Sequence, residues 1–215
     1  MNKIFIIGLP RTGTTSICAA MLELDFRVAH TAYTERTFYE AQVLADTPIF
    51  CDYPDLDRAY PGAKFIYLAR AMDKWLPSIQ KLLARMHTNL IRDDGGFNPI
   101  IKRCYQAIFA PYNLDNINDI EFLAQCYQQH QSQVYQYFKG REDDFLSIDI
   151  SDSKSYKQLL NFLELTIDIN DHEALGVGFE KLNVGSKITA WKDIKNTLKV
   201  DSTNKGRVTK LPYLK

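Results

Sequence analysis

The segment KIFIIGLPRTGTTS, at residues 3–16, constrains the fold more than any other part of the chain. Residues 4–7 form a compact, β-rich apolar run, which is typical of a strand buried on both faces. Residues 16–24 place apolar side chains at helical spacing. A glycine-bounded loop between such a strand and such a helix directs backbone N–H groups at one point, where the helix dipole adds positive potential. The segment therefore predicts a phosphate-binding loop.

This loop resembles the nucleotide-phosphate pattern G-x-x-x-x-G-K-(S/T) but lacks its lysine. Gly8 and Gly13 occupy the two glycine places, Thr14 replaces the lysine, and Arg11 is the nearest cation. In nucleoside triphosphatases the lysine bridges the β- and γ-phosphates, so triphosphate hydrolysis is not expected here. The residues expected to hold the phosphate are Pro10, Arg11, Thr12, Gly13, Thr14, Thr15 and Ser16.

Further strands are predicted at residues 48–51, 64–69 and 145–150, and a further helix at 73–86. Strands that alternate with helices predict an α/β fold, a doubly wound parallel sheet of P-loop type. Residues 1–215 are expected to form one domain, because this length suits one sizeable core. A helical insertion at about residues 87–142 either completes the core or forms a lid or acceptor-binding wall. Residues 199–215 are basic and predict a solvated tail.

Composition excludes several classes of partner. The 26 basic residues balance 26 acidic ones, so no overall field favours nucleic acid or an anionic membrane. The apolar run at residues 4–9 is too short for a signal peptide, and no stretch approaches the ~20 apolar residues of a membrane span. The four cysteines form no C-x-x-C pair and no metal-like cluster, which indicates reduced thiols and no bound metal. We therefore expect a cytoplasmic protein, whose oligomeric state the sequence does not indicate.

A second anion site is predicted after the strand at residues 64–69. Arg70 follows the carboxyl end of this strand, where parallel sheets bind their ligands. Ser78 comes eight residues later, in the next helix, and is expected to face the same space. Arginine binds phosphate through two parallel hydrogen bonds, so this pair predicts a second phosphate site. The alternative is that Arg70 is a structural ion-pair partner.

Together, the segments GLPRTGTTS and FIYLARAMDKWLPS resemble the sulfotransferase family that uses 3′-phosphoadenosine-5′-phosphosulfate, and in particular its PRTGTTS subgroup. The resemblance implies that the loop binds the 5′-phosphosulfate and that Arg70 and Ser78 bind the 3′-phosphate. It implies sulfuryl transfer to a hydroxyl or amine of a small-molecule or glycan acceptor, leaving adenosine 3′,5′-bisphosphate. No metal is expected, because Arg11, where the family usually carries a lysine, would stabilise the leaving oxygen.

The proton acceptor has several candidates. Cytosolic members of the family place a catalytic histidine after a short strand and before a Leu-Pro or similar pair. The corresponding place is assigned to Asp52, in FCDYP, which is the preferred base. His30 follows another possible strand end and has an ordinary pKa suited to base work. Glu35 and Glu40 fit the position of a glutamate in carbohydrate-modifying members only loosely.

The resemblance also implies a basic, glycine-containing loop near the 3′-phosphate or adenine, for which Lys181, Gly185 and Lys187 are the candidates. Two other functions are compatible with the sequence. A P-loop small-molecule kinase is disfavoured by the missing lysine and by the lack of a clear Mg²⁺-holding acid after a strand. A non-catalytic nucleotide-binding protein with the same fold is the other alternative.

Overall fold

The computed structural model describes residues 2–165, 179 and 190–214 of the chain. Its described strands are β1 (Ile4–Ile6), β2 (Val28–Ala29), β3 (Val43–Ala45), β4 (Lys64–Ala69) and β5 (Phe145–Asp149). They form one sheet in the order β2-β3-β1-β4-β5, and every pairing is parallel. The predicted α/β class and parallel sheet are therefore confirmed.

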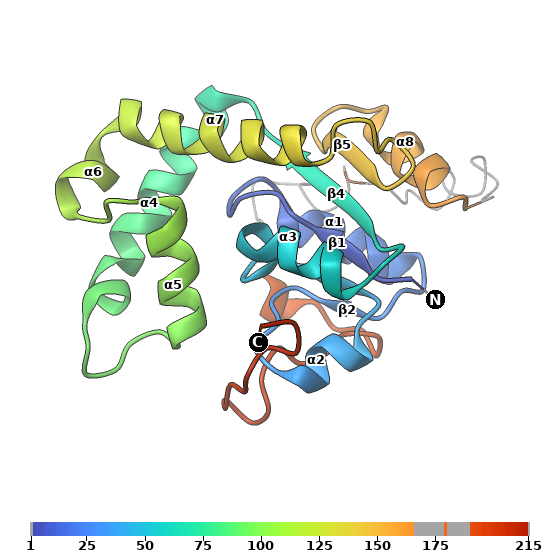
Figure 1. Cartoon of the computed structure of the whole chain (residues 1–215), viewed down its shortest axis with the longest axis horizontal. Helices are drawn as coiled ribbons and strands as arrows, with labels where there is room; N and C mark the ends of the chain where they lie inside the picture. The colour runs from blue at the N-terminus through green and yellow to red at the C-terminus, as the bar shows by residue number, and fades with distance from the viewer. Residues whose placement is uncertain (1, 166–178, 180–189, 215) are drawn as a thin grey trace.

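Helices connect successive strands and also form the insertion between β4 and β5 (Figure 1). The predicted helix after the loop is α1, and the predicted helix after residues 64–69 is α4. The described α-helices are α1 (Thr14–Glu23), α2 (Glu35–Glu40), α3 (Ile49–Ala59), α4 (Met72–Ile91), α5 (Pro99–Ile108), α6 (Leu114–Asn118), α7 (Ile120–Tyr137) and α8 (Ser155–Phe162), and a short 3₁₀ helix, η2, spans Trp191–Asp193.

The two faces of the sheet bury alternate residues of each strand, as the period of a strand requires. Ile4 and Ile6 of β1 pack in one cluster with apolar residues of α1 and α8. Phe5, between them, packs in a second cluster with residues of α3 and the end of α7. Both faces are covered, which explains why β1 is a continuous apolar run rather than an alternating one.

The insertion forms a helical lobe that extends beyond the sheet, with α4, α5 and α6 on the left of Figure 1 and α7 returning across the top. A third apolar cluster lies inside this lobe and includes the fully buried Trp75, Leu83 and Phe109. Leu9 and Phe50 belong to the same cluster, so the lobe packs against the loop after β1 and the start of α3. A helical insertion is present as predicted, but it begins earlier than residue 87, because α4 belongs to the lobe, and it supplies core of its own.

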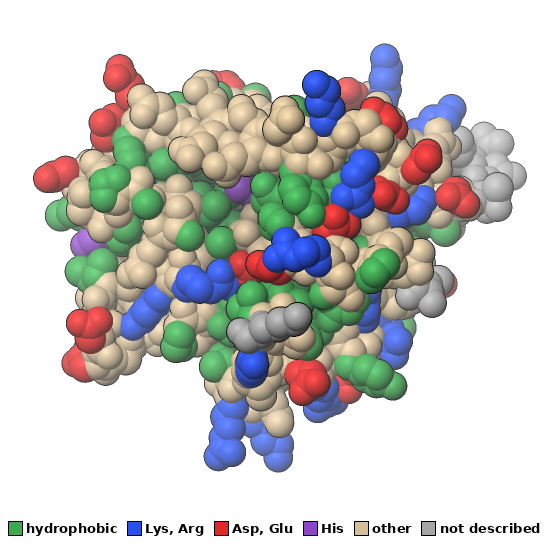
Figure 2. All heavy atoms as spheres, viewed as in Figure 1, with side chains coloured by type: hydrophobic (Ala, Val, Ile, Leu, Met, Phe, Trp, Pro, Cys, Tyr) green, Lys and Arg blue, Asp and Glu red, His purple; other side chains and the backbone are tan. Residues whose placement is uncertain are grey.

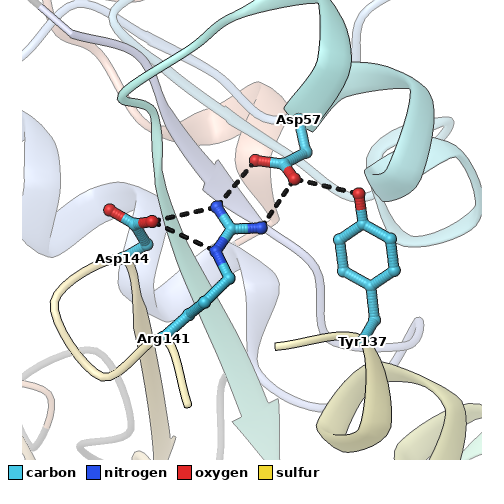
Figure 3. A network of polar contacts seen from close by, with 4 residues as sticks. All are labelled: Asp57, Tyr137, Arg141 and Asp144. Atoms are coloured by element: carbon cyan, nitrogen blue, oxygen red, sulfur yellow. Dashed lines mark hydrogen bonds and ion pairs between the residues drawn. The ribbon is translucent and has the colours of Figure 1, made fainter. Parts of the chain in front are cut away.

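Arg141 fixes the point where the chain returns from the lobe to the sheet. Its guanidinium donates two hydrogen bonds to Asp57 of α3, at 2.7 and 2.9 Å, and further ones to Asp144, just before β5 (Figure 3). The Tyr137 hydroxyl donates to the same Asp57 carboxylate at 2.9 Å. The Arg141 hydrogen bonds lower the pKa of Asp57, so the pair remains charged at neutral pH. This network joins the end of α7, α3 and β5.

Two sequence predictions about the fold are wrong. Residues 48–51 are not a strand: Pro48 precedes α3, and the third strand of the chain is β3, at Val43–Ala45. The apolar Ile49 and Phe50 are buried because they lie on the inward face of a helix. A three-residue strand is shorter than the window over which periodicity identifies a strand, so β3 was not found.

The C-terminal segment is not a solvated tail. The Val200 N–H donates to the Val28 carbonyl at 2.9 Å, which adds the segment beside β2. The Thr209 N–H donates to the Tyr33 carbonyl at 3.0 Å, and Leu211 is 3% exposed within the second apolar cluster. The segment is therefore part of the folded unit, although its composition is basic.

Two surface findings bear on the expected partners. Acidic and basic side chains are interspersed over most of the face in Figure 2, in agreement with the balanced charge of the sequence. Among the described residues, no helix has the length and apolar character needed to cross a membrane.

Candidate functional site

A cavity of about 390 Å³ lies at the carboxyl ends of the strands. Each of the five strands is followed by residues that line it, and α4 and α5 add a wall from the helical lobe. The carboxyl edge is where open parallel sheets bind ligands. The lining residues are Pro10 to Ser16 after β1, His30 after β2, Asp46 after β3, Arg70 and Ala71 after β4, Asp149 to Ser151 at and after β5, Lys74 and Leu82 of α4, and Tyr105 of α5.

The loop after β1 has the backbone geometry of an anion cradle. Arg11 and Gly13 both have left-handed φ angles, of 72° and 104°. The φ of Gly13 is strained for any residue with a side chain, so this position favours glycine, and a Cβ atom there would also have to displace the end of the Ile150 side chain. α1 begins at Thr14, and the first N–H groups of a helix have no partner within it. Those of Thr14 and Thr15 are thus available to an anion in the cavity.

Neighbouring elements hold the loop in place from outside. Trp75 Nε1 of α4 donates to the Pro10 carbonyl at 3.0 Å, and the Arg70 guanidinium donates to the Arg11 carbonyl. The Arg70 backbone is itself fixed by the Tyr127 hydroxyl, which accepts from the Arg70 N–H at 2.9 Å and donates to the Arg70 carbonyl at 3.1 Å. The helical lobe therefore sets the shape of the loop.

The structure brings the arginines of the two predicted anion sites to one cavity, whereas Ser78 is not among its described lining residues. Arg11 Nε donates to Ser78 Oγ at 2.8 Å, and Arg11 and Arg70 both line the cavity. Burial, and then the nearby charge of Arg11, lower the pKa of Arg70. Two cations held this close at a partly buried site repel each other, and a bound anion would relieve that repulsion. This is the charge arrangement expected of a phosphate site.

Beside the loop, His30 and Asp46 form a polar cluster with the two threonines that begin α1. His30 Nε2 lies 3.2 Å from Thr14 Oγ1 and 3.1 Å from Thr15 Oγ1. Thr14 Oγ1 also lies 3.3 Å from Asp46 Oδ2. Burial lowers the pKa of His30, although Asp46 acts in the opposite direction, so the imidazole is neutral at pH 7. The other oxygen of Asp46, Oδ1, accepts hydrogen bonds from the Thr47 N–H at 2.8 Å and from the Thr47 hydroxyl at 3.0 Å.

Asp52 does not lie where the sequence predicts it. It lies within α3 rather than after a strand, and it is not among the described residues that line the cavity. Its carboxylate is buried and accepts hydrogen bonds from Arg103, at 2.8 and 2.6 Å, and from the Tyr213 hydroxyl, at 2.8 Å. With both oxygens occupied, this carboxylate is a structural group.

Asp46 matches the pattern that was assigned to Asp52, because it follows the short strand β3 and precedes the pair Thr47-Pro48. The sequence signal was the run VLADTP, in which an acid ends a short apolar segment. Asp149, at the end of β5, was missed as well. The sequence showed no clear Mg²⁺-holding acid after a strand, whereas the structure places Asp46 and Asp149 in the cavity lining at strand ends.

The remaining candidates lie elsewhere. Glu35 is exposed in the first turn of α2, and Glu40 forms an ion pair with Arg36 at 2.7 Å. Neither glutamate is among the described lining residues. Lys181, Gly185 and Lys187 lie outside the described part of the chain.

Comparison with known proteins gave one family. The family model for a sulfotransferase domain matches residues 3–37 and 31–187. These segments span the loop after β1, Arg70 and all five strands described above. A search of curated protein sequences found no significant match.

Proposed function

This chain belongs to the sulfotransferase domain family, and we propose that it moves a sulfuryl group from 3′-phosphoadenosine-5′-phosphosulfate to a hydroxyl or amine of a small-molecule or glycan acceptor. One observation carries the choice of donor. An anion-cradling loop, a second arginine-containing site and a carboxylate converge on one cavity at the carboxyl ends of the strands. A nucleotide that carries anionic groups at both its 3′ and 5′ positions fits two such sites. The four cysteines are free, and we propose a cytoplasmic location on that basis.

The donor-binding roles follow from the positions of the groups. The N–H groups at the start of α1 face the 5′-phosphosulfate, and the left-handed Arg11 and Gly13 give the loop its curvature. Arg70 and Ser78 bind the 3′-phosphate, for which Arg70 offers a fork of donors and Ser78 a hydroxyl. Arg11, which bonds Ser78 in the structure, lies between the two subsites.

The reaction is a displacement at sulfur. The acceptor oxygen or nitrogen forms a bond to sulfur, the bond from sulfur to the phosphate oxygen breaks, and the acceptor proton passes to a base on the protein. Arg11 neutralises the charge that develops on the leaving oxygen, and the loop N–H groups do the same for the phosphate. Because these groups already supply the positive charge, we propose that the step needs no metal.

Asp46 is the proposed base, in place of Asp52. Its carboxylate lines the cavity, and within the described part of the chain its Oδ2 atom has only the long 3.3 Å contact to Thr14, so that oxygen is available to a proton from the acceptor. His30 is a second, weaker candidate, because its Nε2 atom already lies against two threonine hydroxyls. We assign His30 the role of positioning those hydroxyls beside the loop.

Asp46 favours one alternative function, a small-molecule kinase, because an acid that follows a strand next to the loop can hold Mg²⁺. Two observations oppose it. The loop has Thr14 where a kinase of this type needs lysine, and the matched family transfers sulfuryl rather than phosphoryl groups. The two functions differ in donor, which makes them separable by experiment.

The test is a screen of acceptors. The purified chain is incubated with 3′-phosphoadenosine-5′-phosphosulfate and with phenols, sterols, sugars or amines, and products are identified by mass spectrometry. We expect a sulfonated product from at least one class, formed without added metal. Transfer of phosphate from ATP to the same acceptors, with no sulfonated product, would contradict the proposal.

A further inference from the structure

Two cysteines that are distant in the sequence meet beside the cavity. Cys51 lies in α3 and Cys104 in α5, and their sulfur atoms and a carboxylate oxygen of Asp52 all lie within 4.8 Å of one another. Both thiols are free. We propose that Cys51 and Cys104 are a redox-active pair, which a peroxide converts into an intramolecular disulfide joining α3 to α5.

The two thiols differ in the way that such a reaction requires. Cys51 is partly exposed, whereas Cys104 is fully buried, so an oxidant reaches Cys51 first. Arg103 Nη1 lies 4.0 Å from the Cys51 sulfur and favours its thiolate form. A hydrogen bond from Cys104 lowers the pKa of Cys51, and Arg103 acts in the same direction. The same hydrogen bond, with burial, raises the pKa of Cys104, which therefore remains a thiol.

The chemistry balances with a peroxide as the only oxidant. The Cys51 thiolate attacks one peroxide oxygen, the O–O bond breaks, and Cys51 becomes a sulfenic acid while hydroxide or alkoxide leaves. The Cys104 sulfur then attacks the Cys51 sulfur, a disulfide forms, and water leaves with the Cys104 proton. An external dithiol reduces this disulfide to the two thiols by thiol–disulfide exchange and is itself oxidised to a disulfide.

Metal binding is the competing use of this cluster, and the charges disfavour it. Both oxygens of Asp52 are bound by the Arg103 guanidinium, and Oδ2 also accepts from the Tyr213 hydroxyl. A cation bound there would face a fixed positive charge and would have to displace it from the carboxylate. Oxidation of the two thiols leaves this ion pair intact.

The pair is coupled to the cavity through its neighbours in the chain. Tyr105, the residue after Cys104, lines the cavity from α5. A disulfide has a sulfur–sulfur distance of about 2.05 Å and restricts the distance between the two backbones. Its formation would therefore fix α5 against α3 next to Tyr105. We infer that oxidation lowers sulfotransferase turnover, an inference that rests on the proposed function.

The first experiment measures thiols and does not depend on any enzymatic activity. The folded protein is treated with hydrogen peroxide, and its free thiols are counted and mapped by mass spectrometry. Wild type is expected to lose two of its four thiols, to show a Cys51–Cys104 cross-linked peptide, and to recover all four with dithiothreitol. Cys51→Ser should lose none. The matched control is Cys126→Ser, which should lose two thiols and form the cross-link as wild type does. Burial raises the pKa of Cys126 to about 11, so this thiol should not react.

Several results would overturn the redox pair. They are four unreacted thiols in wild type, irreversible oxidation of Cys51 without a cross-link, or a disulfide that includes another cysteine. Zinc that co-purifies with wild type and is absent from Cys51→Ser would show that the two cysteines form a metal site instead of a redox pair.

A second experiment tests the coupling. Turnover of wild type should fall severalfold on oxidation and return with dithiothreitol, while Cys51→Ser keeps its activity throughout. If the cross-link forms and turnover is unchanged, the coupling through Tyr105 is wrong. If no sulfotransferase activity is found at all, the proposed function fails, and the thiol count still decides the redox pair.

Discussion

Replacing Asp52 by asparagine should lower stability without lowering turnover. The buried carboxylate accepts two hydrogen bonds from Arg103 and one from Tyr213. Hydrogen bonds to a charged group contribute ~1.5–3 kcal/mol each. The single oxygen of asparagine can replace Oδ2 and keep two of the three bonds, but it is uncharged, and the Arg103 bond to Oδ1 is lost because an NH2 group stands there. The Arg103 side chain is 42% exposed and regains water when released, which reduces the cost to about 2–3 kcal/mol.

Urea unfolding followed by circular dichroism measures this loss, which for a chain of this size corresponds to a Tm lower by about 4–12 °C. Glu164→Gln is the matched control, because Glu164 is 83% exposed in its pair with Lys64 and should cost below ~1 kcal/mol. The kcat of Asp52→Asn, measured well below its Tm, should stay within about threefold of wild type, against the ~10²–10⁴-fold loss expected on removing a base. A hundredfold loss of kcat with unchanged stability would restore Asp52 as the base and refute the structural assignment.

Three further predictions concern the site and the core. Asp46→Asn should lower kcat by ~10²–10⁴-fold and leave binding of adenosine 3′,5′-bisphosphate unchanged. His30→Gln should lower kcat less. If steady-state kinetics show the larger loss of kcat in His30→Gln, His30 is the base. EDTA should leave turnover unchanged, and activity that requires added Mg²⁺ would contradict the metal-free step. Burial lowers the pKa of His130 to about 4, whereas the unfolded side chain binds a proton below its ordinary value of 6.5. The free energy of unfolding therefore falls by up to roughly 3 kcal/mol as pH falls from 6.5 to 4. In urea titrations, the free energy of unfolding of His130→Asn should depend less on pH than that of wild type.

The parts of the fold with strong local patterns were predictable from the sequence. β4 has its expected bounds, and the loop with Gly13 and the strand-ending Arg70 both line the cavity as expected. These features depend on contiguous residues: an apolar run, a glycine turn and a helix start. Parallel strands then place their carboxyl ends at one edge of the sheet, which brings Arg70 and the loop to one cavity without further information.

The errors arose where distant residues decide the outcome. Asp52 looked like a free acid before a proline, but its partners Arg103 and Tyr213 come from α5 and the C-terminal segment. Asp46 was missed because the three residues of β3 are too few to show a period. The pairing of Cys51 with Cys104 likewise depends on how α5 packs against α3, which no local pattern encodes.

The measurement that tests the central claim most directly is calorimetric titration with two nucleotides of equal phosphate number. Adenosine 3′,5′-bisphosphate should bind wild type much more tightly than adenosine 5′-diphosphate, because only the former reaches both Arg70 and the loop. Losing two charge-assisted bonds from Arg70 costs about 3–6 kcal/mol, so Arg70→Ala should weaken bisphosphate binding by roughly two to four decades and abolish the preference. Arg70→Lys keeps the charge but loses the two parallel donors of arginine. Its affinity for the bisphosphate should lie between those of wild type and Arg70→Ala. Equal binding of the two nucleotides by wild type, or a preference that survives in Arg70→Ala, would contradict the account.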